Sequence, residues 1–182
     1  MILILSGPSG AGKDTVIDAW QEINPLVKRI VTVTTRRPRS GETDGLDYRF
    51  VDREEFDRMV DTAELLEHKL VHGSMYGTPV DQVRQFEAEG RIVVLCIDVQ
   101  GGAEVKKLRP DAVSVFLMAP SLEELRKRLQ DRGSESDEMI ELRMKNAVEE
   151  IQASKDYDHH LVNDTVHNVV RQLESLVTQV TA

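Results

Sequence analysis

The sequence predicts an α/β fold in which a parallel sheet is flanked by helices. Apolar runs of strand length alternate with segments of helical periodicity, and two of these runs are continuous, as in strands buried on both faces. A glycine-rich turn joins the first run to the first helical segment, as in parallel sheets that bind ligands beyond their carboxyl ends. The 182 residues, 40% hydrophobic and 30% charged, suit one globular domain.

The first predicted elements are a strand and the helix that follows the glycine-rich turn. Residues 2–5 are apolar, and residues 14–23 place apolar side chains at helical spacing. The pair Asn24-Pro25 ends this helix, because a residue before proline avoids helical backbone angles. The β-branched residues 30–35 predict the next strand.

Residues 35–90 break the alternation and predict a small α+β insertion between core elements. The segments 48–51 and 65–71 are extended in character. Asp52 and Glu55 have the spacing of a helix N-terminal cap. A second short helix is expected over 79–89, with a proline in its first turn and a glycine after its end.

The alternation of strands and helices resumes after the insertion. Residues 92–97 and 113–118 are the two continuous apolar runs and predict buried strands. Ser121 and Glu124 form a capping box that begins another helix. The remaining elements are expected at 103–108, 137–154 and 166–180 as helices and at 161–162 as a strand.

The composition argues against two classes of binding partner, nucleic acid polymers and membranes. The net charge of −9 argues against a protein that coats a nucleic acid polymer, because that role depends on basic patches. No apolar run approaches the ~20 residues needed to span a bilayer, so no membrane partner is expected. The single cysteine, Cys96, cannot form an intrachain disulfide, which favours a reducing cytoplasm. The residues do not indicate an oligomeric state.

The glycine-rich turn fits the phosphate-binding pattern G-x-x-x-x-G-K. Its members are Gly7, Pro8, Ser9, Gly10, Ala11, Gly12 and Lys13. Glycines allow a ring of backbone N–H groups around a phosphate, and the following helix directs the positive end of its dipole to the same point. Lys13 can then reach the β- and γ-phosphates of a nucleotide. The pattern predicts an enzyme that transfers a phosphoryl group from a nucleotide.

The position after Lys13 departs from the usual pattern. It commonly holds Ser or Thr, whose hydroxyl binds Mg²⁺, whereas here it is Asp14, followed by Thr15. A carboxylate is a competent oxygen ligand for Mg²⁺ and also favours a helix N-terminus. Asp14 could bind the metal, hold one of its waters or only cap the helix, and the sequence leaves these three roles open.

Several separated motifs in a fixed order extend over essentially the whole chain. They are SGPSGAGK at 6–13, TTRRPR at 34–39 with Gly41 and Glu42, GLDYRF at 45–50, Glu67, YGT at 76–78, IDVQG at 97–101, RKRLQDRG at 126–133 and VND at 162–164. Together these motifs resemble the guanylate kinases.

The resemblance implies a P-loop kinase core, an inserted GMP-binding subdomain and a helical lid in a single domain of 1–182. The core would comprise 1–34 and 91–182, the insertion 35–90, and the lid would lie within 126–157. The resemblance also implies ATP and GMP as substrates, ADP and GDP as products, and Mg²⁺ as the cofactor.

The resemblance assigns the GMP site residue by residue. Four side chains match those that hold the GMP phosphate: Arg36, Arg39, Tyr48 and Tyr76. Two guanidinium forks and two phenols suit a dianion. Glu67 matches the guanine reader, since a carboxylate can accept from N1–H and N2–H₂, which adenine does not offer on that edge. Three further positions match residues near GMP: Thr32, Thr78 and Asp98.

The resemblance also assigns the ATP side. Arg132 and Arg143 match lid arginines that neutralise charge on the transferred phosphoryl group, and Asn163 matches a position beside the donor adenine. The expected ATP-binding set is the turn 7–13 with Asp14, Thr15, Arg132 and Asn163. The expected catalytic set is Lys13, Arg36, Arg132 and Arg143. Cys96 departs from the family, which has an acidic residue two positions before Asp98.

The expected reaction is a direct in-line transfer without a covalent enzyme intermediate, since the GMP phosphate is already an anionic nucleophile. One alternative is a related kinase of ribose 1,5-bisphosphate, which also has Lys-Asp after its P-loop glycines. The positions Glu67 and Thr78 argue against it. The other alternative is a non-catalytic guanylate-kinase-like module that binds phosphopeptides, and Lys13 with the lid arginines argues against that module.

Overall fold

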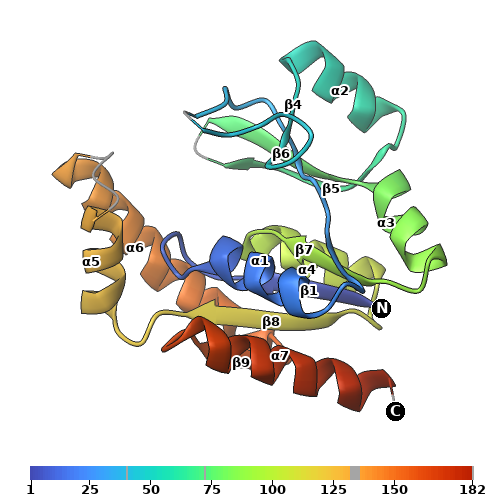
Figure 1. The fold of residues 1–182 in the computed structure, drawn as a ribbon. Coiled ribbons are helices and arrows are strands. Elements are labelled where there is room, and N and C mark those ends of the chain that lie inside the picture. Colours follow the sequence, from blue (N-terminus) through green and yellow to red (C-terminus); the bar gives the residue numbers. More distant parts are fainter. Residues whose placement is uncertain (40, 72, 132–135, 182) are drawn as a thin grey trace. The chain divides into compact units, whose positions relative to one another are not determined.

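A computed structural model describes residues 1–39, 41–71, 73–131 and 136–181 (Figure 1). The strands within these residues are β1 (Ile2–Ser6), β2 (Val27–Arg29), β3 (Val33–Thr34), β4 (Arg49–Phe50), β5 (Leu65–Val71), β6 (Ser74–Pro79), β7 (Ile92–Cys96), β8 (Val113–Met118) and β9 (His159–Val162). The helices are α1 (Lys13–Ile23), α2 (Arg53–Asp61), α3 (Val80–Ala88), α4 (Val99–Leu108), α5 (Leu122–Asp131), α6 (Asp137–Ala153) and α7 (Val166–Thr181), with a 3-10 turn at Ser154–Asp156.

The first sheet contains the predicted parallel strands. Its strand order is β2-β7-β1-β8-β9. The pair β2 and β7 is parallel, with Val27 opposite Ile92, and the pair β8 and β9 is parallel, with Val115 opposite His159. Parallel neighbours require crossover connections, and the connection within each of these two pairs contains helices. This arrangement confirms the predicted α/β class.

Backbone contacts divide the chain into two compact units. The first unit comprises Met1–Leu3, Leu26–Leu95 and Gln100–Ala112, and the second comprises Ile4–Pro25, Cys96–Val99 and Val113–Ala182. The glycine-rich turn and the helices α5, α6 and α7 thus belong to the second unit. Among the described residues, no helix is long and apolar enough to cross a membrane.

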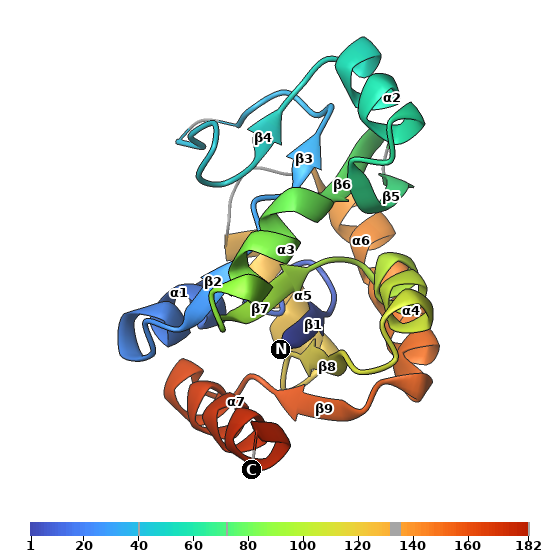
Figure 2. The same cartoon turned by 90° about the vertical axis from the view of Figure 1, so that its right-hand side faces the viewer.

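The second sheet lies within the first unit and has the order β4-β3-β6-β5, which Figure 2 shows. The strands β5 and β6 are antiparallel, and β3 pairs antiparallel with β6. Val33, Phe56 and Met59 form a small core there, with Phe56 and Met59 supplied by α2. Gly77 permits this packing, because a Cβ at that position would lie 2.7 Å from Cδ1 of Leu65.

The predicted strand at 30–35 is confirmed only over its part Val33–Thr34, because the pairing in the first sheet ends before this segment and that in the second begins within it. β2 precedes the predicted segment and belongs to the first sheet, whereas β3 covers only Val33–Thr34 and belongs to the second. Ile30 still donates its N–H to the carbonyl of Val94 at 3.0 Å, but the N–H of Val31 donates to Oε1 of Gln82 at 2.6 Å. A side chain far along the sequence therefore ends the strand pairing, and β-propensity carries no such information.

Two further elements differ from expectation. The strand β6 was not predicted, and the helix expected at 103–108 begins at Val99. Gly101 and Gly102 lower the intrinsic helix propensity of that first turn, yet both are buried inside α4. Tertiary packing thus overrides propensity at this point. The other predicted helices and strands are confirmed to within a few residues.

The second unit is held together by two helix pairs. The helices α5 and α6 share a buried cluster that includes Leu125, Leu129 and Ile140. On α1, Trp20 is fully buried and donates its indole N–H to Glu174 of α7. Asn24 donates to the same carboxylate oxygen at 2.8 Å. These bonds fix α1, which begins at the end of the glycine-rich turn.

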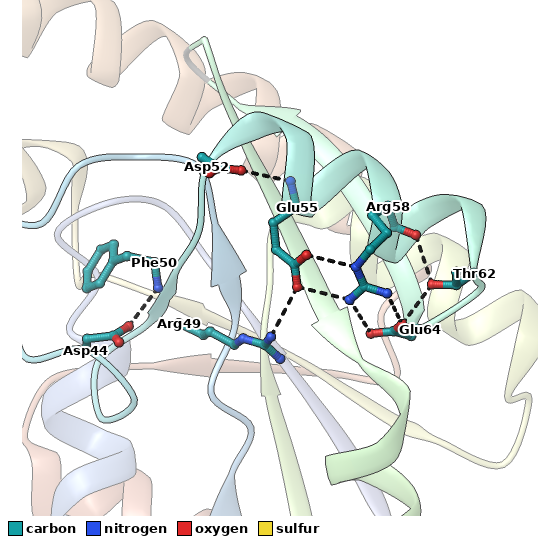
Figure 3. A network of polar contacts seen from close by, with 8 residues as sticks. All are labelled: Asp44, Arg49, Phe50, Asp52, Glu55, Arg58, Thr62 and Glu64. Carbon is teal, nitrogen blue, oxygen red and sulfur yellow. Dashed lines mark hydrogen bonds and ion pairs between the residues drawn. The ribbon is translucent and has the colours of Figure 1, made fainter.

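The helix α2 of the first unit begins at the predicted cap. The carboxylate of Asp52 accepts the N–H of Glu55 at 2.8 Å, as Figure 3 shows. The side chain of Glu55 contacts Arg49 and Arg58, and Arg58 also contacts Glu64 at the end of the helix. This exposed network joins α2 to Arg49 of β4 and to Glu64, the residue before β5.

We expect Asp52→Ala to lower the free energy of unfolding by about 0.5–2 kcal/mol, because the first turn of α2 loses the acceptor for one of its N–H groups. Chemical unfolding followed by circular dichroism measures the change. Asp61→Ala removes an exposed carboxylate from the other end of the same helix and should change stability by less than about 0.5 kcal/mol. Equal losses in both variants would contradict a capping role.

Candidate functional site

The glycine-rich turn starts at the carboxyl end of β1, a strand whose residues are all buried. Two of its glycines permit close approach of neighbouring groups. A Cβ at Gly7 would lie 2.2 Å from the carbonyl oxygen of Leu117, and a Cβ at Gly12 would lie 2.5 Å from Nδ2 of Asn163. Gly12 also has a φ of +91°, a left-handed conformation that glycine adopts without a steric penalty. The glycines at the first and last glycine positions of the motif are therefore required by the packing around the turn.

Lys13 lies directly over this turn. Its ammonium donates to the carbonyl of Gly7 and, at 3.2 Å, to that of Pro8. Gly12 is the N-cap of α1 and has no side chain that could accept a hydrogen bond. The first N–H groups of the helix therefore receive no side-chain cap from it. The arrangement gathers a positive charge and helix N–H groups at one point, which suits a bound phosphate.

Asn163 fixes the turn from behind. Its buried amide donates to the carbonyl of Ala11 at 2.8 Å, and its own N–H donates to Met118 at 2.7 Å. Arg128 donates to the carbonyl of Asn163 at 3.2 Å. A cavity of about 310 Å³ lies beside these groups, lined by Gly10, Gly12, Thr15, Arg128, Asn163, Asp164, Thr165 and Val166. Its place next to the turn suits a nucleobase.

The helix α6 carries a cation, Arg143, and a carboxylate, Glu150, on the same face. Arg143 donates from Nη1 to Oγ of Ser9 at 2.5 Å, which places a guanidinium at the glycine-rich turn. Ala147, one turn later, is buried, and Glu150 follows at the next turn. Arg132, expected to act with Arg143, lies outside the described residues.

Glu150 belongs to a partly buried polar cluster at the end of β1. Burial raises the pKa of the Glu150 carboxyl, the charge of Lys13 lowers it, and the charge of Asp98 raises it. Tyr157 donates to Oγ of Ser6 at 2.7 Å, and burial raises the pKa of its phenol to about 12. Neither Glu150 nor Tyr157 was predicted as part of a site, because an acidic helix face and an isolated tyrosine give no distinguishing pattern.

The raised pKa of Glu150 gives the protein a specific dependence on pH. The native state keeps a proton on this carboxyl at pH values where the unfolded chain, with a pKa near 4.5, has released it. The free energy of unfolding then falls as pH rises through that interval. Glu150→Gln removes the dependence, so we expect its Tm to match the wild type near pH 4.5 and to exceed it at pH 7–8. Thermal unfolding across this range measures the difference.

Glu149→Gln is the matched control, because Glu149 is the exposed neighbour on the same helix. Its Tm should follow the wild type at every pH. A Glu150→Gln variant less stable than the wild type at neutral pH would show that the attraction of Lys13 outweighs the cost of burial.

The second sheet assembles a separate group around Arg36. The guanidinium of Arg36 donates from Nε to the hydroxyl of Tyr76 at 3.2 Å and lies 5.2 Å from the ring centre of Tyr48. Glu42 accepts from both terminal nitrogens, and this carboxylate raises the pKa of Arg36, while Arg36 lowers the pKa of Glu42. Arg39 is exposed on the same loop. Three of the four predicted phosphate residues are therefore in mutual contact.

Glu67 and Thr78 form a buried pair on the same sheet. They lie opposite each other on β5 and β6, and the hydroxyl of Thr78 donates to Oε1 of Glu67 at 2.6 Å. A carboxylate that is only 7% exposed needs donors, and the hydroxyl supplies one for a single oxygen. Thr32 is also buried in the first unit.

The remaining predicted residues have distinct surroundings. Asp14 and Thr15 are exposed in the first turn of α1. Asp98, which the resemblance placed near GMP, belongs to the second unit, where its carbonyl accepts from Ser6 at 3.4 Å and its charge acts on Glu150. Cys96 is half-buried at the end of β7.

Comparisons with known proteins agree on one family. A family model described as guanylate kinase matches residues 1–180. A guanylate kinase of Thermobifida fusca is 48% identical, with 97% of this chain and 90% of the relative covered. A guanylate kinase of Lactobacillus johnsonii is 45% identical, with 97% and 87% covered. The crystal structure of guanylate kinase from Anaplasma phagocytophilum matches with a TM-score of 0.82 at 34% identity, over 98% of this chain and 85% of that one.

Proposed function

The chain belongs to the guanylate kinase family and phosphorylates GMP to GDP with ATP, and we propose the following division of this work among its residues. The observation that carries the proposal is the presence of two separate anion-binding groups. One is the glycine-rich turn with Lys13 in the second unit, and the other surrounds Arg36 in the first unit. A kinase with two phosphate-bearing substrates requires two such groups.

ATP is proposed to bind in the second unit. The backbone N–H groups of residues 7–13 and the ammonium of Lys13 would hold its phosphates, and the cavity beside Asn163 would hold adenine. Arg143, already at Ser9, would neutralise charge on the transferred phosphoryl group together with Arg132. Asp14 and Thr15 lie at the start of α1, where phosphates meet the helix.

GMP is proposed to bind on the second sheet. Arg36, Arg39, Tyr48 and Tyr76 would hold its phosphate, since charged forks and phenols in contact suit a dianion. Glu67 would accept from the guanine N1–H and N2–H₂, while the hydroxyl of Thr78 also donates to its Oε1 and Thr32 lies near the base. Asp98 would lie close to GMP, as the resemblance implies.

The donor side fits Mg²⁺ as an ion carried mainly by the nucleotide. Within the described ranges, no group of three or more His, Cys, Asp or Glu side chains could hold a metal ion. Mg²⁺ often binds one or two carboxylates together with substrate phosphates and waters, which the exposed carboxylate of Asp14 can satisfy. When bound, the ion would offset negative charge on the β- and γ-phosphates.

The chemical step is proposed to be a direct in-line displacement. A GMP phosphate oxygen forms a bond to the γ-phosphorus of ATP while the bond to the β,γ-bridging oxygen breaks, and ADP leaves. The nucleophile is already anionic, so no strong general base is required. The protein's contribution is then to position the two substrates and to stabilise charge through Lys13, Arg36, Arg132 and Arg143.

The proposed roles correspond to segments of the chain. Residues 35–90 would form the GMP-binding insertion, residues 126–157 would contain the lid, and 1–34 with 91–182 would form the core. Closure of the lid would exclude water and suppress hydrolysis of ATP. Free nucleotides as substrates favour the cytoplasm as the compartment of the reaction.

A coupled assay tests the proposal by measuring ADP and GDP from MgATP and GMP. GDP should form only when both substrates are present, and AMP should be a poor acceptor. Ribose 1,5-bisphosphate, tested in parallel, should give no product. Absence of GDP formation by folded protein would overturn the proposed function.

A further inference from the structure

Glu42 follows the arginine motif in the sequence and has no role assigned to it so far, yet it contacts two arginines of the proposed phosphate site. Its Oε2 accepts from Nη1 of Arg36 at 2.9 Å, and its Oε1 accepts from Nη2 at 2.8 Å. Its Oε2 also accepts the backbone N–H of Arg39 at 2.7 Å, and its own N–H donates to the carbonyl of Arg39 at 3.1 Å. One carboxylate thus contacts both arginines of the proposed phosphate site.

The contacts of Arg36 determine which edge of its guanidinium faces a ligand. Glu42 occupies the edge formed by the two terminal nitrogens, and Nη1 also donates to the carbonyl of Arg37 at 2.8 Å. The Nε edge is turned to the hydroxyl of Tyr76, and the planar face lies over the rings of Tyr48 and Phe50. Bonds to described residues account for four of the five N–H groups, one on Nε, two on Nη1 and one on Nη2.

We propose that Glu42 is a positioning residue for GMP, which holds Arg36 so that its Nε edge faces the phosphate and fixes the backbone at Arg39. The proposal rests on the proposed function. Without the carboxylate, Arg36 keeps its charge but can rotate about its long side chain, so a planar fork that requires fixed geometry is no longer pre-organised. The loop also loses the acceptor for the N–H of Arg39.

The opposite role for Glu42 would be competition with GMP. A carboxylate that occupied the Nε edge would have to leave before a phosphate could bind there, and its removal would tighten binding. The contacts argue against this role, because Glu42 accepts from the two terminal nitrogens, whereas Nε donates to the hydroxyl of Tyr76. The two roles predict changes of opposite sign in the affinity for GMP.

Binding of GMP and of guanosine to Glu42→Gln tests the proposal. Guanosine retains the base but lacks the phosphate, so its Kd reports on the guanine contacts alone. We expect the Kd of GMP to rise by about 10- to 100-fold and the Kd of guanosine to stay within about twofold of the wild type. In steady state, KM for GMP should rise more than kcat falls, and KM for ATP should be unchanged.

Two controls separate positioning from a general loss of structure. Glu54→Gln neutralises an exposed carboxylate on α2 of the same unit and should alter neither Kd. In an Arg36→Lys background, which lacks the fork, Glu42→Gln should weaken GMP by less than about threefold, because Glu42 acts through that fork. Thermal unfolding of each variant shows whether it is folded.

The outcomes differ for the two proposals. Equal weakening of GMP and guanosine, unchanged GMP binding or tighter GMP binding in Glu42→Gln would each overturn the positioning role while leaving GMP phosphorylation intact. A wild-type protein that binds GMP no better than guanosine and forms no GDP would overturn the proposed function and the positioning role together.

Discussion

Replacement of Lys13 by methionine is expected to lower kcat for GDP formation by about 10²- to 10³-fold, the usual cost of removing one preorganised charge from a transition state. Methionine keeps most of the length of the side chain but removes the ammonium that lies over the glycine-rich turn at Gly7 and Pro8. The charge that develops on the transferred phosphoryl group would then lack one of its neutralising partners. Steady-state kinetics at saturating ATP and GMP measure the loss.

The matched control is Lys107→Met, which makes the same change at an exposed lysine near the end of α4. Its kcat should remain within about twofold of the wild type. Because Lys13 also bonds to the turn, thermal unfolding and ATP binding of Lys13→Met must be measured beside its kinetics. A variant that binds ATP normally and retains more than a tenth of the wild-type kcat would contradict the role given to Lys13.

The second large effect is expected at Glu67. Glu67→Gln should lower kcat/KM for GMP by about 10²- to 10³-fold and reduce the preference for GMP over AMP by a similar factor, because a site built around one hydrogen-bond pattern discriminates strongly. The amide keeps one acceptor but turns a donor toward guanine or toward Thr78, whose hydroxyl now donates to Oε1. Parallel assays with GMP and AMP measure both quantities.

Thr78→Val gives a graded test of the same pair. It removes the hydroxyl that orients Glu67 but leaves the carboxylate, so we expect a loss of only about tenfold in kcat/KM for GMP. If Glu67→Gln slowed GMP and AMP equally, the residue would be needed for folding of the sheet and not for recognition of the base.

The fold was predictable where local pattern and packing agree. The buried strand β1, the helix after it and the continuous runs β7 and β8 have signals that depend only on neighbouring residues. The segment after Ile30 was not predictable in this way, because the side chain of Gln82 ends its pairing. The start of α4 was hidden by glycines whose burial outweighs their propensity.

For the candidate site, too, the sequence indicated residues within local motifs but not the contacts between distant residues. The spacing of the glycine-rich turn and the resemblance supplied Lys13, Arg36 and Glu67. Glu150 has no sequence signal of its own, and Glu42 belongs to one of the motifs, although its place there does not indicate what it contacts. The charge of Lys13 acts on Glu150 although the two residues lie far apart in the sequence, and the contacts of Glu42 with Arg36 and Arg39 depend on the course of the loop.

The bonds from Trp20 and Asn24 to Glu174 have a practical consequence for spectroscopy. Trp20 is the only tryptophan in the chain, it is buried, and it lies on the helix that begins at Lys13. Its fluorescence therefore comes from the second unit alone, whereas Tyr48 and Tyr76 lie in the first. Selective excitation of the indole is therefore expected to give a label-free signal of local opening around α1, to which Tyr48 and Tyr76 do not contribute.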